Sequence, residues 1–210
     1  MNIFSEDNAF GRGFRRIMDM IAVNFMWLLC CVPLVTIGAS TAALYDRTMK
    51  MAREEDGDGL IRPFFASFFR NLLRGTGLFA LALVVGALIY VDYVAATQLG
   101  GMMAGLCQVV IIASLLLYIG TLSHSFMVLS HFNTGVFQTV KLAFIHMMGG
   151  GWRSILIGVL FAAPVILFVV APLAFLQTGV VWATVAVALI AYINCTLFCK
   201  RFQKEEEEAE

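Results

Sequence analysis

Five long apolar stretches constrain what this chain can fold into. They cover approximately residues 21–45, 75–97, 102–129, 152–176 and 180–198, and their interiors contain no Lys, Arg or Glu. Each is close to or longer than the ~20 apolar residues that a helix needs to cross a bilayer. In hydrocarbon, segments this long and without alternation can satisfy their backbone only as helices. The sequence therefore predicts an all-α polytopic membrane protein with five hydrophobic segments.

Composition agrees with lipid as the solvent for most of the surface. Hydrophobic residues make up 60% of the chain. Charged residues make up 13%, whereas soluble domains carry about 25%. The net charge is zero, and no nucleic-acid partner is expected. The five cysteines lie in apolar runs at spacings that fit no zinc or haem site, so neither a metal nor a cofactor is predicted.

The basic residues predict the orientation. All fourteen Lys and Arg residues lie before the first segment, in the 46–74 loop, in the 130–153 loop or after the fifth segment. The short turns at 98–101 and 177–179 contain none, so these turns are expected outside and the two loops and the C-terminus inside. Residues 1–199 are expected to form a single membrane domain, and 200–210 a disordered acidic cytoplasmic tail.

The first segment leaves two alternatives open. Five full crossings would place the N-terminus outside, together with its three arginines, against the distribution of the other basic residues. Pro33 and Gly38 lie near the middle of this segment, so it can instead enter and return as a re-entrant hairpin with the N-terminus inside. A faint repeat, Ile37-Gly38 with Ser40 and Ile119-Gly120 with Ser123, favours the crossing.

Short amphipathic helices are predicted in the cytoplasmic loops. The clearest one lies within 61–74, where the apolar residues recur at helical spacing and the basic residues take the opposite face. Its defining residues are Phe64, Phe65, Phe68, Phe69, Arg70 and Arg74. Weaker versions lie at 134–148 and 8–20. Such helices are typical of membrane surfaces, although the protein's own spans or a partner could equally cover the phenylalanines.

Polar groups inside the apolar segments are the candidates for chemistry. Asp92 lies between two tyrosines near the outer end of the second segment, which favours an interfacial position over a proton or substrate contact. The third segment carries a polar stripe at helical spacing, with a histidine at its edge: Ser114, Tyr118, Thr121, His124 and Ser125. Such stripes more often join helices than line a conduit. The sequence contains no catalytic motif, so we do not expect an enzyme.

One run is specific enough to indicate a family. Residues 33–45 read P-L-V-T-I-G-A-S-T-A-A-L-Y, preceded by Asn24 and Trp27-Leu28-Leu29. Together with the amphipathic helix and the five-segment layout, this run resembles the YesL family of bacterial membrane proteins, a family of unknown function. The resemblance implies a multi-pass protein of the bacterial cytoplasmic membrane, linked to carbohydrate ABC importers by association. It offers no catalytic residues.

The same run predicts a packing or docking surface. Its small and turn-forming residues let another helix approach closely: Pro33, Thr36, Gly38, Ser40 and Ala42. The partner could be the protein's own helices, a second copy or a transporter subunit. We therefore expect an accessory protein whose partners are the bilayer and either importer subunits or a copy of itself. The alternative is a small solute transporter that uses the polar stripe together with Asp92.

Overall fold

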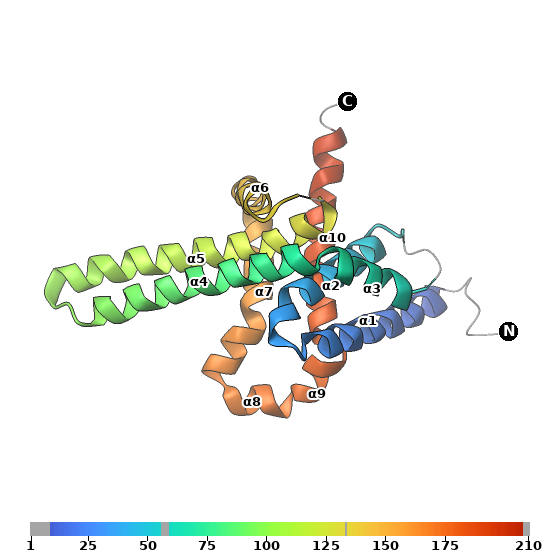
Figure 1. Ribbon diagram of the computed structural model, residues 1–210, viewed down its shortest axis with the longest axis horizontal. Coiled ribbons are helices and arrows are strands. Elements are labelled where there is room, and N and C mark those ends of the chain that lie inside the picture. Colours follow the sequence, from blue (N-terminus) through green and yellow to red (C-terminus); the bar gives the residue numbers. More distant parts are fainter. Residues whose placement is uncertain (1–8, 56–58, 133, 208–210) are drawn as a thin grey trace.

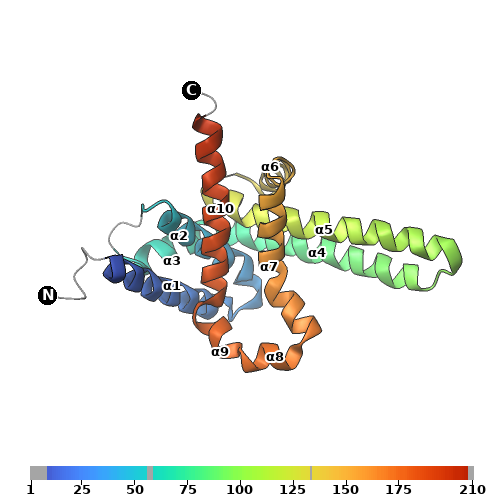
Figure 2. The same ribbon diagram turned by 180° about the vertical axis from the view of Figure 1, so that it is seen from behind.

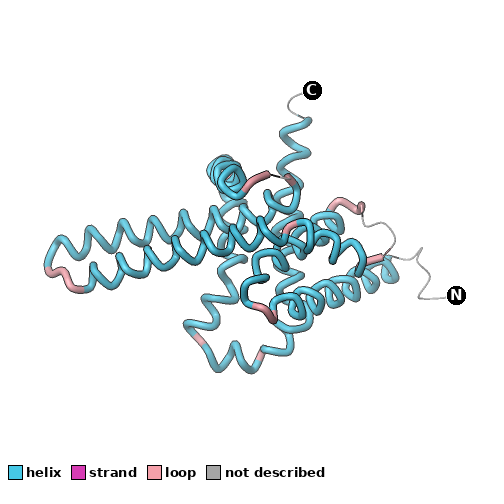
Figure 3. Tube along the Cα trace, viewed as in Figure 1, coloured by secondary structure: helices cyan, strands magenta, loops and turns pink. Residues whose placement is uncertain are grey.

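The computed structural model describes residues 9–55, 59–132 and 134–207. All regular structure in these ranges is helical, with no strand (Figure 3). Four helices in this part of the chain are long and apolar enough to cross a membrane: Leu72–Thr97, Gly101–His131, Trp152–Val170 and Gly179–Cys199. These helices confirm an all-α polytopic membrane fold, whereas the predicted count of five hydrophobic segments is wrong.

The first predicted segment is the one that fails as a single span, because its helix breaks at Pro33. Helix α1 (Ala9–Cys31) merges the expected N-terminal amphipathic helix with the first half of the segment. A 3₁₀ turn, η1 (Leu34–Thr36), then reverses the chain into α2 (Ile37–Ala52). The Arg16 guanidinium donates to the carbonyl oxygen of Met51 at 3.0 Å, so the far ends of α1 and α2 meet. This is the hairpin that the re-entrant alternative expects.

The remaining helices form two further hairpins. After α3 (Ile61–Arg70), α4 (Leu72–Thr97) and α5 (Gly101–His131) run side by side. After α6 (Val136–Gly149), α7 (Trp152–Val170) is joined to α10 (Val187–Glu207) through α8 (Pro172–Gln177), α9 (Gly179–Val181) and a π-helical turn, η2 (Trp182–Ala186). In Figures 1 and 2 the α4–α5 hairpin extends along the long axis, and α7 and α10 run across it.

Two predicted boundaries can be compared with the helices. The surface helices α3 and α6 form where the amphipathic patterns at 61–74 and 134–148 place them. Helix α10 continues to Glu207, into the tail that the sequence predicts to be disordered, and 208–210 lie outside the described residues.

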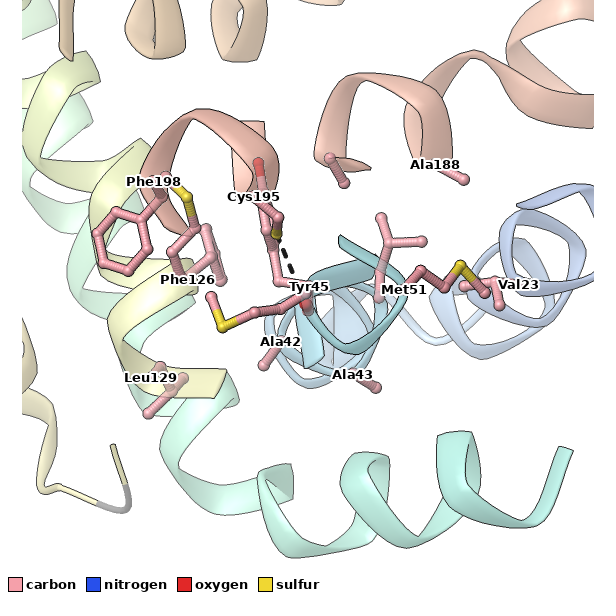
Figure 4. Close-up of a cluster of buried hydrophobic side chains, with 14 of the residues drawn as sticks. Val23, Ala42, Ala43, Tyr45, Met51, Phe126, Leu129, Ala188, Cys195 and Phe198 are labelled. Atoms are coloured by element: carbon pink, nitrogen blue, oxygen red, sulfur yellow. Dashed lines mark hydrogen bonds between the residues drawn. The ribbon is translucent and has the colours of Figure 1, made fainter. Parts of the chain in front are cut away.

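The core lies where the three hairpins meet. Most of its side chains come from α1, α2, α5 and α10, as Figure 4 shows for Val23, Tyr45, Phe126 and Cys195. Helix α2 is the centre of this cluster, because it packs against α1, α4, α5 and α10. Residues 38–49 of α2 are all buried except Thr41. A helix surrounded in this way serves as a scaffold rather than as a lipid-facing span.

Unlike the buried helix α2, the α4–α5 hairpin leaves most of its length exposed. Between residues 83 and 118, Ala96 is the only buried residue. Helices of 26 and 31 residues extend about 39 and 46 Å at 1.5 Å per residue. The exposed side chains are apolar along most of this length, which suits contact with lipid or with another membrane helix.

The hairpin formed by α1 and α2 gives a testable topology. In a variant without native cysteines, a cysteine at Leu99 or Thr178 should react with an impermeant thiol reagent in intact cells. A cysteine at Gly13 or Glu55 should react only after lysis, because both ends of the first hairpin are expected inside. Gly13 is exposed and has nothing within 4 Å of the position of a Cβ, so the new side chain is accommodated. Labelling of Gly13→Cys in intact cells would contradict the hairpin topology.

Candidate sites: helix packing, buried polar groups and a surface helix

The small-residue run packs against the protein's own fourth helix. A Cβ on Gly38 would overlap the carbonyl oxygen of Gly75 and lie 2.7 Å from the Cβ of Phe79. A Cβ on Gly75 would in turn lie 2.7 Å from the backbone of Ala39. Helices α2 and α4 are therefore in backbone contact at these glycines, as small residues permit. Among the predicted surface residues, Gly38, Ser40 and Ala42 are buried, whereas Pro33 is exposed.

A second glycine contact repeats this arrangement between α5 and α7. The position of a Cβ on Gly158 lies 3.8 Å from the Cα of Gly120. Gly120 is the residue that the faint sequence repeat pairs with Gly38. In each case an amphipathic surface helix, α3 or α6, lies between the two helices in the chain. The sequence repeat therefore corresponds to a repeated structural unit, in which two helices pack at glycines and a surface helix connects them in the chain.

A buried polar link between the first and third hairpins is absent from the predicted sites. The side chain of Asn24, fully buried on α1, donates to the carbonyl oxygen of Trp182 at 3.1 Å. Its Oδ1 accepts the backbone N–H of Ala188 at 3.0 Å. These backbone groups border the π-helical turn, where the regular hydrogen-bond ladder changes register. The feature that marks such a residue in the sequence is an amide inside an apolar stretch, and Asn194 on α10 is another.

Tyr45 and Asn194 join α2 to α10 in the same core. The Asn194 amide donates to the Tyr45 hydroxyl at 3.4 Å, and the thiol of Cys195 lies 3.7 Å from the Tyr45 carbonyl oxygen (Figure 4). The buried Tyr45 hydroxyl acts as a hydrogen-bonding group between the two helices.

Helices α2 and α3 are joined by an ion-pair cluster around Asp46. Its carboxylate forms ion pairs with the Lys50 ammonium at 3.3 Å and with the Arg70 guanidinium at 3.4 Å. Arg70 was predicted to face an anionic surface or partner, and here it ties α3 to α2. The neighbouring Arg47 is buried, donates to the carbonyl oxygen of Gly59 at 3.4 Å, and leaves its Nε without a hydrogen-bond partner. Arg47 and Arg70 thus form contacts within the protein.

The phenylalanines of α3 divide between the core and the surface. Phe64 and Phe68 are buried, and Phe65 is half-buried against the core. Phe69 is 67% exposed. The protein's own core therefore covers much of the apolar face that the sequence placed at a membrane surface. Ile61 on α3 and Leu73 at the start of α4 are also exposed, at 66% and 86%.

His124 lies apart from the polar stripe, in a buried cluster between α5 and α7. Its Nδ1 lies 2.9 Å from the carbonyl oxygen of Gly120, which fits an N–H donor there and leaves Nε2 to accept from Ser154, 3.2 Å away. This Ser–His pair has the geometry of a base beside a hydroxyl, but both side chains are buried. Its direct effect is to join α5 to α7 beside the Gly120–Gly158 contact. Within the described residues no three His, Cys, Asp or Glu side chains are grouped to hold a metal.

The other stripe residues face a groove bounded by α4, α5 and α6, with a volume of about 690 Å³. Tyr118 donates across its floor to the carbonyl oxygen of Ala82 at 2.9 Å, and Ser125 donates to the carbonyl oxygen of Thr121 at 2.7 Å. The lining is otherwise mostly apolar, apart from Ser114, Thr121 and Lys141. Asp92 lies exposed toward the far end of α4, outside the groove. The structure therefore does not combine Asp92 with the stripe.

The hydrogen bond from Tyr118 to Ala82 is expected to contribute only a little to the stability of the fold. Hydrogen bonds between membrane helices average about 0.6 kcal/mol, so Tyr118→Phe should lower the apparent Tm of the purified protein by about 1–2 °C. Tyr93→Phe, on the exposed part of the same hairpin, is the control and should leave the Tm unchanged. A drop much larger than 5 °C for Tyr118→Phe would assign this hydroxyl a role beyond joining α5 to α4.

Comparisons with known proteins are limited to part of the chain. No curated protein and no solved structure matches it. A family model does match over residues 20–93, about a third of the sequence. That stretch includes Asn24, the Gly38–Gly75 contact, α3 and most of α4. Over these residues the chain matches the family described as a protein of unknown function, DUF624.

Proposed function

We propose that this chain is a non-enzymatic accessory protein of the bacterial cytoplasmic membrane, which binds subunits of a carbohydrate importer of the ABC type. The link to carbohydrate uptake rests on the resemblance to the YesL family, with which the match over residues 20–93 is compatible. The interaction role rests on surfaces that the chain leaves uncovered.

The observation that carries the proposal is the outer face of α3 and the start of α4. Ile61, Phe69 and Leu73 are exposed there, next to the exposed Arg62. Most of this patch precedes the first of the four candidate spans, in a loop expected on the cytoplasmic side. Exposed apolar side chains cost roughly 25 cal/mol per Å² in water, so a covering surface is favoured. An apolar patch with a basic rim suits a partner that offers apolar and acidic side chains.

The geometry gives less support to a sugar carrier. Sugars need many hydrogen-bonding groups in a cavity, whereas Tyr118 and Ser125 in the groove donate to backbone carbonyls. Asp92 lies outside the groove.

The test is recovery of partners after mild-detergent purification of the tagged protein. The wild type should retain importer subunits, and Phe69→Ser combined with Leu73→Ser should lose most of them and the dependent sugar uptake. The variant should remain in the membrane fraction, because three of the four candidate spans are unchanged and Leu73 is only the second residue of the 26-residue span Leu72–Thr97. Phe137→Ser, which replaces an exposed phenylalanine on α6, is the matched control and should behave as the wild type.

Two results would contradict the proposal. One is full retention of importer subunits by the double variant. The other is solute-specific flux through liposomes that contain this chain alone, since an accessory protein should give none. Cross-linking of the wild type in membranes separates importer subunits from a second copy of the chain, because the two give different masses.

A further inference from the structure

The groove between α4, α5 and α6 is built for an apolar chain. Leu81, Val85 and Ile89 line it from α4, and Phe144 lines it from α6. It borders α4 from Leu78 to Ile89, a length of about 16 Å at 1.5 Å per residue. This is close to one leaflet of a bilayer, which is about half of the ~30 Å hydrocarbon core.

One cation lies at the edge of this apolar lining. Lys141 on α6 is exposed, and within the described residues no carboxylate forms an ion pair with it. The sequence contains no Asp or Glu between Tyr93 and Lys204, so α5, α6 and α7 supply no acidic group for it. The groove thus combines a hydrocarbon-like interior with an ammonium at its rim that no described carboxylate pairs with.

We propose that this groove binds an anionic glycerophospholipid of the membrane, with one acyl chain along α4 and α5 and the phosphate at Lys141. The groove complements both the acyl chain and the headgroup of such a lipid. The apolar lining accepts the chain, and the ammonium pairs with the phosphate. Helix α6 is expected at the cytoplasmic surface, where the headgroup of an inner-leaflet lipid lies. Tyr118 and Ser125 do not compete for the headgroup, because both donate to backbone carbonyls.

Native mass spectrometry of the delipidated protein tests the proposal. The protein is mixed with equal amounts of phosphatidylglycerol and phosphatidylcholine that carry the same acyl chains. Wild-type protein should bind phosphatidylglycerol in about fivefold excess, the ratio expected from one basic residue at an anionic lipid. Lys141→Gln should bring the ratio close to one and retain total bound lipid, because the apolar lining is unchanged. Val85→Trp should lower the binding of both lipids, since the larger side chain occupies the groove.

Two controls separate this site from general attraction of anions. Arg62→Gln removes an exposed cation on α3 and should keep the fivefold preference. Millimolar inorganic phosphate should not displace bound phosphatidylglycerol, because it supplies no acyl chain. Equal binding of the two lipids by the wild type, an unchanged ratio in Lys141→Gln, or displacement by phosphate would each overturn the proposal. The Lys141 change is at an exposed side chain that forms no ion pair with any described residue, so loss of folding does not explain its result.

Discussion

Gly38→Leu is expected to yield little folded protein, and what is recovered should unfold at a temperature about 6–12 °C lower. The reason is the backbone contact between α2 and α4, in which Gly38 faces the carbonyl oxygen of Gly75 without space for a side chain. Overpacking of side chains costs about 1–3 kcal/mol, and a clash against backbone should reach the upper end. For a chain of this size, 1 kcal/mol shifts Tm by about 2–4 °C. Size-exclusion chromatography and thermal unfolding in detergent measure both effects.

Gly105→Leu is the matched control for this prediction. Gly105 lies on α5 with nothing within 4 Å of the position of a Cβ, so the same substitution there should be nearly silent. If Gly38→Leu matched Gly105→Leu in yield and Tm, α2 and α4 could not be in backbone contact.

Asn24→Leu is the second change with a large expected effect. It removes the acceptor for the Ala188 N–H and the donor to the Trp182 carbonyl oxygen, and both of these backbone groups then lack this partner. Of the two groups, the Ala188 N–H is the buried one. A buried group without a hydrogen-bond partner costs about 1–3 kcal/mol, so the variant should lose about 1–3 kcal/mol of stability. Hydrogen exchange supplies a local measurement, because the Ala188 amide should exchange faster in the variant than in the wild type.

Phe25→Leu is the control, since Phe25 is adjacent on α1 but 59% exposed. It should change neither the Tm nor the exchange of Ala188. Unchanged exchange at Ala188 in Asn24→Leu would mean that Asn24 does not hold the π-helical turn.

Hydropathy predicted the helical class and four of the spans, but it miscounted the first segment. A run of apolar residues does not show where the chain reverses, and the break at Pro33 depends on a single missing N–H and a turn. Pro33 and Gly38 did indicate the hairpin as one alternative. The structure supports it through the contact between Arg16 and Met51.

Local residue spacing predicted which residues share a helix face, but it did not predict which part of the protein or the membrane covers that face. Helical period identifies the face of α3 that carries Phe64 and Phe68, although it does not say whether protein or lipid covers that face. The small residues around Gly38 predicted close packing, but its partner, Gly75, follows from the fold. Asp92 and the stripe were joined in one hypothesis because both are polar, but the groove lining on α4 ends at Ile89 and does not include Asp92. An amide inside an apolar stretch marks Asn24 as a candidate, but no local pattern indicates its partner at Trp182, 158 residues away.

The contacts of α10 also set the order in which the protein can be completed during synthesis. Asn24 and its partner at Trp182 are separated by 158 residues. At about 5–20 residues per second, a ribosome needs roughly 8–30 s to make that stretch. Throughout this interval α1 and α2 have already been synthesised, while the Asn24 amide and the Tyr45 phenol lack the helix with which they form hydrogen bonds. The earliest part of the chain is therefore among the last to reach its final state. If a ribosome stalls before α10 is made, the buried polar side chains of the first hairpin are left without these hydrogen-bond partners.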